Sequence, residues 1–284
     1  MKLTKNQTAF IREFLSYCRP HGSSTEKQFI SRFLLSCHPA TYQDGFGNIH
    51  LDLRADKSHR TLFVGHTDTV HRRAGFQRVL FDKTSQTFTT TGECLGADDG
   101  AGLLVLLHLI ASNVPAYYIF TRCEERGGQG AKHLLDYHSD LLCEFDRAIA
   151  FDRKGTSSVI THQGWGRCCS DEFADALCDA LDGPDLMYAP DDTGVYTDTA
   201  EFVDLIPECT NVSVGYFNEH RPIESLDGAH LLALMEQVTR IEWDQLPTAR
   251  DPYATEASTA YDWYTWDSDG LGGIRRSFRG LWTH

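Results

Sequence analysis

Four apolar segments of this sequence end in, or run into, side chains that can bind metal ions. In chain order these side chains are His66, Asp68, Glu124, Glu125, Asp152 and His220. A further carboxylate, Asp98, opens a glycine-rich segment ahead of another apolar run. Imidazole nitrogens and carboxylate oxygens suit zinc, cobalt and manganese. Each residue alone is more often a helix cap or an ordinary histidine, so only the whole set predicts a metal site.

The elements that would position these side chains alternate between strands and helices. We expect strands over 60–64, 116–121, 147–151 and 211–217, hairpins over 42–53 and 76–91, and glycine-rich turns at 96–102 and 127–130. Apolar spacing predicts helices over 5–18, 24–37, 103–110, 131–142, 171–181 and 225–245. This order is typical of an α/β fold with a mixed, largely parallel central sheet and helices on both faces. Ligands of such folds bind at the carboxyl ends of the strands.

Composition and charge exclude several classes of function. The 284 residues carry a formal charge of −14, which argues against a nucleic-acid partner because nucleic acids are polyanions. No apolar run approaches the roughly 20 residues of a membrane span, and the first residues lack the apolar core of a signal peptide. The nine cysteines include no Cys-x-x-Cys pair, so they indicate neither a disulfide framework nor a thiolate metal site. We therefore expect a cytoplasmic protein with no membrane contact.

Four short motifs resemble those of a known superfamily. They are GHTDTV at 65–70, LGADDGAG at 95–102, CEERG at 123–127 and FNEH at 217–220. In this order, over about residues 60–225, they resemble the co-catalytic zinc exopeptidases, which include bacterial leucyl aminopeptidase, peptidase T and the carboxypeptidase G2 type. The resemblance implies a metallopeptidase domain with two divalent metal ions. Zinc is the preferred identification, with cobalt and manganese as alternatives.

The resemblance also implies how the matched residues share the two ions. His66 and Asp152 would hold one ion, and Glu125 and His220 would hold the other. The Asp98 carboxylate would bridge both, which can keep two dications about 3.5–4 Å apart. The superfamily tends to have a cis peptide bond after this bridging aspartate.

Three further residues receive roles from the same resemblance. Asp68 would accept the imidazole N–H of His66 and so orient the ring. Glu124, the first glutamate of its pair, would be the general base that takes a proton from water and delivers it to the leaving nitrogen. The segment 193–202 resembles one that borders the substrate cleft, and there Tyr196 is either a hydrogen-bond donor to the oxyanion or a plain packing residue.

The spacing of the motifs bears on the reaction. Relatives of the carboxypeptidase type insert a lid or dimerisation domain between the positions of Asp152 and His220, and here that interval is too short for one. We therefore expect an aminopeptidase or small-peptide exopeptidase that hydrolyses amides. One alternative is an N-acyl amino acid deacylase or carboxypeptidase-like hydrolase. The other is a non-catalytic binding or scaffold module with a vestigial site.

The chain divides by composition into two parts. Residues 1–247 would form the catalytic metallopeptidase domain. Residues 248–284 place aromatic side chains among Gly, Ser, Thr and acidic residues, with no helical or strand period. We expect this tail to be flexible or wrapped on the surface, or else to dock a partner or a second copy of the chain in a homo-oligomer.

Overall fold

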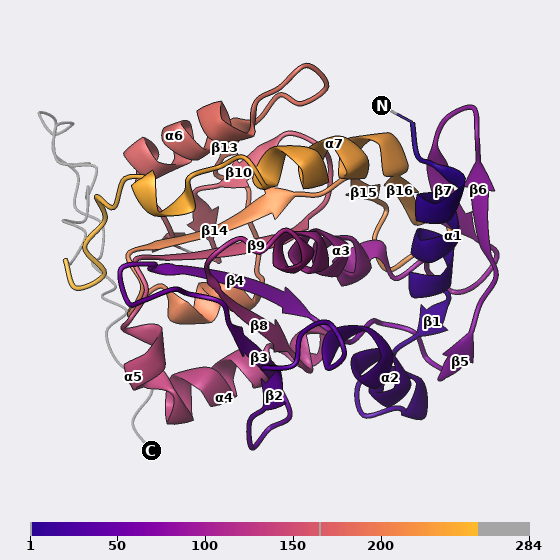
Figure 1. Ribbon diagram of the computed structural model, residues 1–284, viewed down its shortest axis with the longest axis horizontal. Coiled ribbons are helices and arrows are strands. Elements are labelled where there is room, and N and C mark those ends of the chain that lie inside the picture. Colours follow the sequence, from indigo (N-terminus) through magenta and orange to yellow (C-terminus); the bar gives the residue numbers. More distant parts are fainter. Residues whose placement is uncertain (1, 165, 255–284) are drawn as a thin grey trace, which may run out of the picture. The chain divides into compact units, whose positions relative to one another are not determined.

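The computed structural model describes residues 2–164 and 166–254, and its centre is a sheet of eight strands (Figure 1). In order across the sheet, the strands are β13 (Ala189–Asp191), β10 (Ser158–Ile160), β14 (Glu208–Ser213), β9 (Arg147–Arg153), β4 (Thr61–His66), β8 (Tyr117–Thr121), β3 (Ile49–Asp52) and β2 (Tyr42–Gln43). Neighbours from β14 to β8 run parallel, whereas β3 and β2 at one edge and the β10–β14 pair are antiparallel. The structure therefore confirms a mixed α/β sheet with a parallel centre.

Helices cover both faces of this sheet (Figure 1). One face carries α3 (Ala97–Ala111), α6 (Asp171–Leu181) and α7 (Gly228–Val238), and the other carries α4 (Gln129–Tyr137) and α5 (Ser139–Leu142). Successive residues of β4 face opposite sides of the sheet, because side chains alternate across a strand. Phe63 packs into the larger core with α3 and α7, whereas Leu62 and Val64 pack into the second core with α4. The central strands β4, β8 and β14 are thus buried on both sides, whereas the edge strands β2 and β13 are largely exposed.

Smaller elements complete the described chain. They are α1 (Lys5–Phe14), β1 (Tyr17–Cys18), α2 (Ser24–Phe29) with a π-helical turn (Ile30–Leu34), β5 (Gly75–Phe76), β6 (Val79–Asp82), β7 (Thr87–Thr90), β11 (His162–Gln163), β12 (Gly166–Arg167), β15 (Tyr216–Phe217), β16 (Ser225–Asp227), and the 3-10 turns Glu124–Arg126, Asp198–Phe202 and Trp243–Gln245. The β15, β16, β7 and β6 strands form an antiparallel sheet in that order, and β1 pairs with β5. Both predicted hairpins, β2–β3 and β6–β7, are confirmed.

The first two helices end earlier than their apolar spacing predicted. The first ends at Phe14, because residues 17–18 pair with β5 instead of continuing the helix. The second is α-helical only to Phe29 and continues as the π-helical turn. The rings of Phe14 and Phe29 pack 4.6 Å apart at the centre of this pair. Both helices are therefore present, although their predicted boundaries were wrong.

Three other boundaries differ from the prediction. The predicted helix 225–245 is shorter, since residues 225–227 pair with β7 as a strand and the helix ends at Val238. The predicted helix 131–142 is divided at His138 into α4 and α5. The predicted strand 211–217 is two strands, because Gly215 at a φ of 99° turns the chain between β14 and β15.

The segment 96–102 is not one glycine-rich turn. Only Gly96, at a φ of 71°, makes the turn, whereas Gly100 and Gly102 lie inside α3. A Cβ at position 102 would lie 2.1 Å from Oδ1 of Asp99 and 2.5 Å from the carbonyl oxygen of Phe151. Glycine is therefore needed here for close packing of α3 against β9, which the sequence alone did not show.

The interval between Asp152 and His220 contributes to the main sheet. The β10, β13 and β14 strands all arise from it and pair with one another or with β9. Within its described residues, 153–164 and 166–219, the interval forms no separate lid domain. The structure describes only residues 248–254 of the predicted tail, and the remainder lies outside the described residues. No helix in the described part of the chain is long and apolar enough to cross a membrane.

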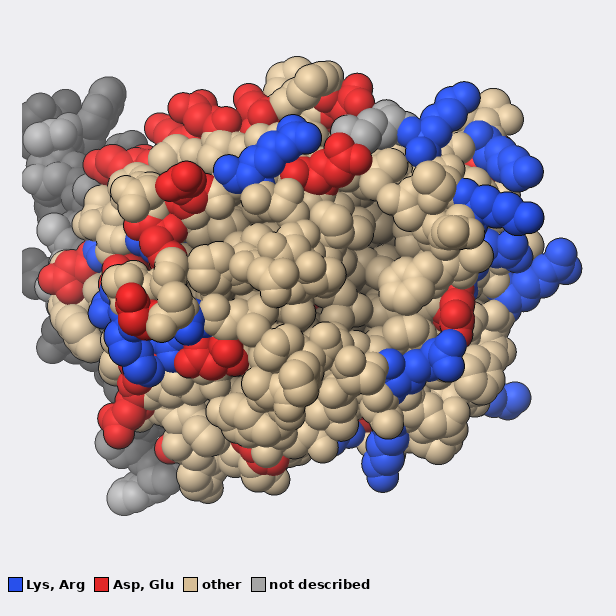
Figure 2. Space-filling model, in the orientation of Figure 1, with Lys and Arg blue, Asp and Glu red and all other residues tan. Residues whose placement is uncertain are grey.

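Charged side chains are unevenly distributed over the molecule. Figure 2 shows acidic side chains gathered over α6 and basic side chains gathered on the side where α1 and the β6–β7 hairpin lie. The exposed acids of α6 include Asp171, Glu172, Asp175 and Asp179. These acidic side chains therefore give the described surface over α6 a negative field.

Candidate metal centre

The predicted metal-binding side chains converge at the carboxyl ends of the parallel strands. His66 is the last residue of β4, Glu124 and Glu125 follow β8, and Asp152 lies near the end of β9. The remaining two are Asp98 at the start of α3 and His220 after β15. The side chains at the ends of β4, β8 and β9 lie close together because these strands are parallel neighbours.

Asp98 stands between two histidines. Its Oδ1 lies 3.1 Å from Nε2 of His66, and its Oδ2 lies 3.1 Å from Nε2 of His220. A second carboxylate accompanies each ring: Asp152 Oδ1 is 3.8 Å from His66 Nε2, and Glu125 Oε1 is 3.1 Å from His220 Nε2. Each oxygen of Asp98 thus faces one pair of a histidine and a carboxylate, as a carboxylate shared by two metal ions would.

The peptide bond between Asp98 and Asp99 is cis, as the resemblance implied. Asp99 turns away from the Asp98 pair and into the protein, where it is fully buried. Its Oδ2 accepts the backbone N–H of His66 at 3.0 Å, and its Oδ1 accepts that of Gly102 at 3.1 Å. Asp99 therefore ties the end of β4 to the first turn of α3.

Hydrogen bonds fix the orientation of Asp152. The Thr197 hydroxyl donates to its Oδ2 at 2.8 Å, and the Tyr216 hydroxyl donates to its Oδ1 at 3.2 Å. The side chain of Asn211 bridges to its backbone, accepting the Asp152 N–H at 2.7 Å and donating to the carbonyl oxygen at 2.7 Å. Partners of this kind hold a carboxylate ligand in one geometry.

Asp68 contacts a different group from the one expected. The nearest acceptor for Nδ1 of His66 is the backbone carbonyl oxygen of Asp68 at 3.1 Å, whereas the Asp68 carboxylate Oδ1 is 3.7 Å away. That Oδ1 instead accepts the backbone N–H of Glu124 at 3.1 Å. The backbone turns so that the carbonyl reaches the ring first. Residue 68 therefore orients His66 through its main chain and the predicted base through its side chain.

Glu124 lies in the same pocket, with Oε2 4.0 Å from Nε2 of His66. Burial raises the pKa of Glu124 to about 8, and the nearby carboxylates of Asp198 and Asp98 add to the rise while His66 opposes it. At this pKa the group is mostly protonated at neutral pH, and nearby positive charge would favour the ionised form that a general base needs. The geometry is therefore compatible with the predicted role.

The carboxylates of this centre favour positive charge on the groups beside them. Burial opposes protonation of His66, but Asp98 and Asp152 outweigh burial and raise its pKa well above the ordinary value. The same carboxylate effect, from Asp98 and Glu125, raises the pKa of His220 to about 10. Glu125 Oε1 is buried and forms no hydrogen bond with the described residues, although His220 lies close to it. Two imidazoles and three carboxylates arranged in this way fit divalent ions such as zinc.

A permanent cation lies beneath this set of carboxylates. Arg19 is fully buried, donates from Nε to the carbonyl oxygen of Thr67 at 2.9 Å, and stacks on the Phe29 ring at 4.3 Å. Burial lowers its pKa to about 10, although Asp99 and Asp68 oppose the fall. The guanidinium is therefore charged at neutral pH, and it partly offsets the buried carboxylates.

Glu224 anchors the segment that carries Asp98. Its carboxylate is 1% exposed and accepts four consecutive backbone N–H groups, those of residues 95 to 98. Burial raises the pKa of Glu224 to about 7, with Asp98 adding to the rise and the backbone N–H groups opposing it. Because Glu224 follows the His220 loop, it links the two segments that bring His220 and Asp98 together.

Tyr196 lines a pocket of about 260 Å³ together with Asp98, Glu124 and His220. Its hydroxyl donates to Oε1 of Glu201 at 2.8 Å. The side chain is 38% exposed. The structure thus places Tyr196 at the predicted cleft but with its hydroxyl engaged, and the oxyanion role stays a prediction.

Several positioning residues were not predicted from the sequence. They are Arg19, Asp99, Thr197, Asn211, Tyr216 and Glu224. Three of them were visible in quoted motifs or next to them: Asp99 within LGADDGAG, Thr197 within 193–202, and Tyr216 immediately before FNEH. Nothing in the sequence marked Arg19 or Glu224, because their contacts join segments far apart in the chain.

Comparisons with known proteins point to one fold. No protein-family model matches the chain, and no curated protein matches its sequence. Among solved structures, the aminopeptidase PepT from Bacillus cereus superposes with a TM-score of 0.67 at 14% identity, covering 82% of this chain and 96% of PepT. The tripeptidase SAV1512 from Staphylococcus aureus gives a TM-score of 0.63 at 13% identity, covering 82% of this chain and 95% of the tripeptidase.

A third structure extends the similarity to an archaeal enzyme. The TET1 peptidase from Pyrococcus horikoshii, which can assemble into a tetrahedron or a large octahedral shell, superposes with a TM-score of 0.60 at 14% identity, covering 82% of this chain and 98% of that peptidase. At these identities the similarity establishes the fold. The chain therefore has the fold of the co-catalytic zinc exopeptidases, the superfamily that its motifs resemble.

Proposed function

We propose that this protein is a metal-dependent amide hydrolase, and specifically an aminopeptidase or small-peptide exopeptidase. The observation that carries the proposal is the position of Asp98, whose two oxygens each lie 3.1 Å from a different histidine. Asp152 and Glu125 flank the two rings, and Glu124 lines the same pocket. The aminopeptidases and tripeptidase that share the fold add support.

In this proposal Asp98 and the four residues around it would hold two divalent ions, with zinc preferred and cobalt and manganese as alternatives. His66 and Asp152 would hold one ion, and Glu125 and His220 would hold the other. When bound, such ions polarise a substrate carbonyl and lower the pKa of water toward about 7. The donor set of nitrogen and oxygen atoms fits each of the three metals.

The residues of the chain perform the proton transfers. Glu124 takes a proton from the attacking water on its carboxylate and delivers it to the leaving nitrogen. Asp68 holds the Glu124 backbone, and Thr197 and Tyr216 hold Asp152 in place. Tyr196 donates to the oxyanion once its hydroxyl leaves Glu201.

The substrate is a small peptide or an N-acyl amino acid. A free α-amino group suits the carboxylates of the pocket and defines the aminopeptidase. Arg153 and Lys154 line the same pocket, paired with Asp191 at 3.6 Å and with Glu219 at 2.7 Å. Their positive charge would suit a substrate carboxylate close to the scissile bond that exchanges with these partners. This observation favours short substrates, and it is also the one that supports the second candidate, an N-acyl amino acid deacylase or carboxypeptidase-like hydrolase.

The assembly and location of the protein are also proposed. A homo-oligomer is supported by the assembly of the TET1 peptidase, which has the same fold. A cytoplasmic location fits the nine free cysteines. A non-catalytic scaffold gains no support, since all the predicted metal-binding residues and Glu124 meet at one site.

The test combines metal analysis with hydrolysis. We expect about two metal ions per chain at this centre and chelator-sensitive cleavage of amino-acid p-nitroanilides. Glu124→Gln should keep its metal and lose a factor of about 10²–10⁴ in kcat, while Glu236→Gln on the surface of α7 keeps the parental rate. Cleavage only of substrates with a blocked amino end would favour the deacylase, and undiminished turnover of Glu124→Gln or of the metal-stripped protein would contradict the proposal.

A further inference from the structure

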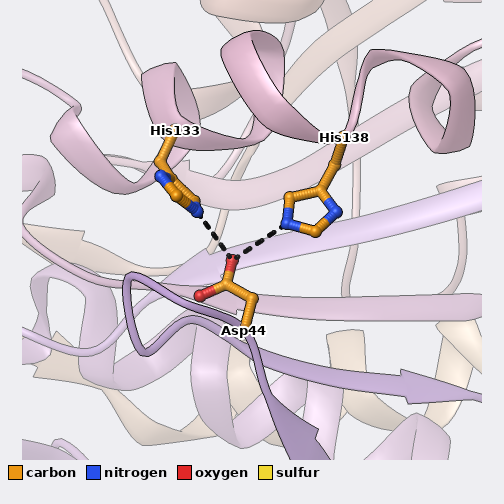
Figure 3. Close-up of side chains that lie close together, drawn as sticks. All are labelled: Asp44, His133 and His138. Atoms are coloured by element: carbon orange, nitrogen blue, oxygen red, sulfur yellow. Dashed lines mark ion pairs between the residues drawn. The ribbon is translucent and has the colours of Figure 1, made fainter.

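A second cluster of metal-binding side chains lies away from Asp98. Asp44 is in the turn between β2 and β3, His133 is in α4, and His138 is the residue that separates α4 from α5. Figure 3 shows both imidazole rings turned toward the Asp44 carboxylate, one from each side. The three donor atoms all lie within 4.8 Å of one another.

The distances leave room between these groups. Oδ2 of Asp44 is 4.0 Å from Nε2 of His133 and 3.9 Å from Nε2 of His138, which is too far for hydrogen bonds. Within residues 2–164 and 166–254, no ring nitrogen of His133 or His138 forms a hydrogen bond. Two imidazoles therefore face one buried carboxylate without making a direct bond to it.

Asp44 is held firmly in this position. Its side chain is 1% exposed, and its Oδ1 accepts the backbone N–H groups of Phe46, Gly47 and Asn48 at 2.7 to 2.9 Å. Its Oδ2 accepts from Nδ2 of Asn48 at 2.8 Å and lies 3.3 Å from Nε2 of the fully buried His50. Hydrogen bonds to a carboxylate ligand fix its direction before any ion binds.

We propose that Asp44, His133 and His138 bind one divalent first-row metal ion, with zinc as the best fit. Zinc takes nitrogen and oxygen ligands at about 2.0–2.1 Å in tetrahedral geometry, which places neighbouring donor atoms about 3.4 Å apart. The two rings therefore approach Asp44 by roughly half an ångström on binding. Their side chains are 19% and 34% exposed, so they have the freedom to move and water has access to the fourth position.

The bound ion would join two parts of the fold. It connects the β2–β3 turn to the junction of α4 and α5. Asn48, in the same turn, accepts the backbone N–H of Arg122 at 3.1 Å and donates to the carbonyl oxygen of Gly130 at 3.2 Å. These two backbone groups flank the loop that carries Glu124 and Glu125. The ion would therefore stabilise the β2–β3 turn, whose Asn48 holds that loop, and it would take no part in the hydrolysis.

A cobalt titration in a background without the first centre tests the inference. His66→Gln combined with His220→Gln removes a histidine from each half of that centre. In this stripped double variant we expect one Co²⁺ per chain, with a visible absorption band, and a melting temperature that rises with added metal. Adding His138→Gln should abolish the band and the shift, whereas adding His108→Gln on α3 should leave both unchanged.

The same measurements in the otherwise unchanged chain separate this inference from the proposed function. His133→Gln with His138→Gln should bind one ion fewer than the parent by elemental analysis, with the circular dichroism spectrum unchanged. If that variant fails to fold, the single variant His138→Gln, at the more exposed ring, replaces it. An equal number of ions in parent and variant would overturn the inference. So would a pH-dependent, metal-independent stability, which would identify the cluster as protonated histidines paired with Asp44.

Discussion

Replacement of Glu224 by glutamine should weaken both the fold and the first metal centre. Oε2 of Glu224 accepts the N–H groups of Leu95 and Gly96 at 2.8 and 3.2 Å, and Oε1 accepts those of Ala97 and Asp98 at 2.7 and 3.3 Å. Glutamine keeps one oxygen and places an NH₂ group where the other stood. In either orientation, two buried N–H groups then face a donor instead of an acceptor.

The magnitude follows from these four bonds. One short bond to a charged acceptor is lost, worth about 1.5–3 kcal/mol, and one longer bond is lost that we value at about 0.5–1 kcal/mol. We therefore expect Glu224→Gln to lower the free energy of unfolding by about 2–4 kcal/mol. Because the segment carries Asp98, we also expect the affinity for metal to fall about 10–100-fold, the usual effect of losing a residue that orients a ligand.

Two assays on the same variant check this reasoning. Denaturant unfolding of the metal-free protein gives the change in stability, and competition with a chromophoric chelator gives the change in metal affinity. Glu93→Gln is the matched control, since Glu93 precedes the same segment but is exposed, and among the described residues it accepts only the N–H of Arg72. A Glu224→Gln protein with parental stability and parental metal affinity would refute the argument that this carboxylate holds Asp98.

Three further predictions test other parts of the structure. Tyr196→Phe should lower kcat by about 10²-fold with little change in KM if its hydroxyl stabilises the oxyanion, and an unchanged kcat would leave it a packing residue. Gly102→Ala places a Cβ 2.1 Å from the Asp99 carboxylate, so thermal unfolding should show a loss of about 3 kcal/mol or more, whereas Gly166→Ala, with open space around it, should be neutral. Burial raises the pKa of Asp191, but the hydroxyls of Ser158 and Thr193 outweigh burial and hold it below the ordinary value. The ionised form therefore contributes stability that is complete above the unfolded pKa and is lost as pH falls through the lower folded value. Asp191→Asn should thus reduce the loss of unfolding free energy between about pH 5 and pH 3, and an unchanged acid dependence would contradict this assignment.

Local signals predicted much of the fold. The α6 helix begins and ends as expected because Ser170 caps its first turn and Phe173, Ala174 and Leu177 form one buried stripe. The hairpin over 42–53 was predicted from its turn residues, and the hairpin over 76–91 from the alternation of its residues. The errors lie where pairing with a distant segment decided the local structure, as at residues 225–227, which pair with β7 instead of starting a helix.

The same distinction between local signals and long-range contacts applies to the candidate site. His66, Asp98, Glu125 and His220 were predicted because each stands in a quoted motif, and Asp152 was predicted because it follows an expected strand. The predicted acceptor for the His66 ring N–H, the Asp68 carboxylate, is not the nearest one. The path of the backbone through Asp68 brings its carbonyl oxygen nearer to the ring. Hydrogen bonds of Arg19 and Glu224 span 48 and 129 residues of sequence, respectively, and no local pattern encodes such contacts.

The wide spacing of these residues along the chain has a consequence for folding. The centre draws on segments from Arg19 to Glu224, and they meet only when β8, β4, β9 and β14 have paired in parallel. Parallel pairing between distant segments is slow, because the entropy of closing long loops is lost before the contacts form. Assembly of the centre therefore depends on this long-range pairing. Recovery of metal binding during refolding should therefore mark the completion of the whole sheet and should follow the appearance of helical secondary structure.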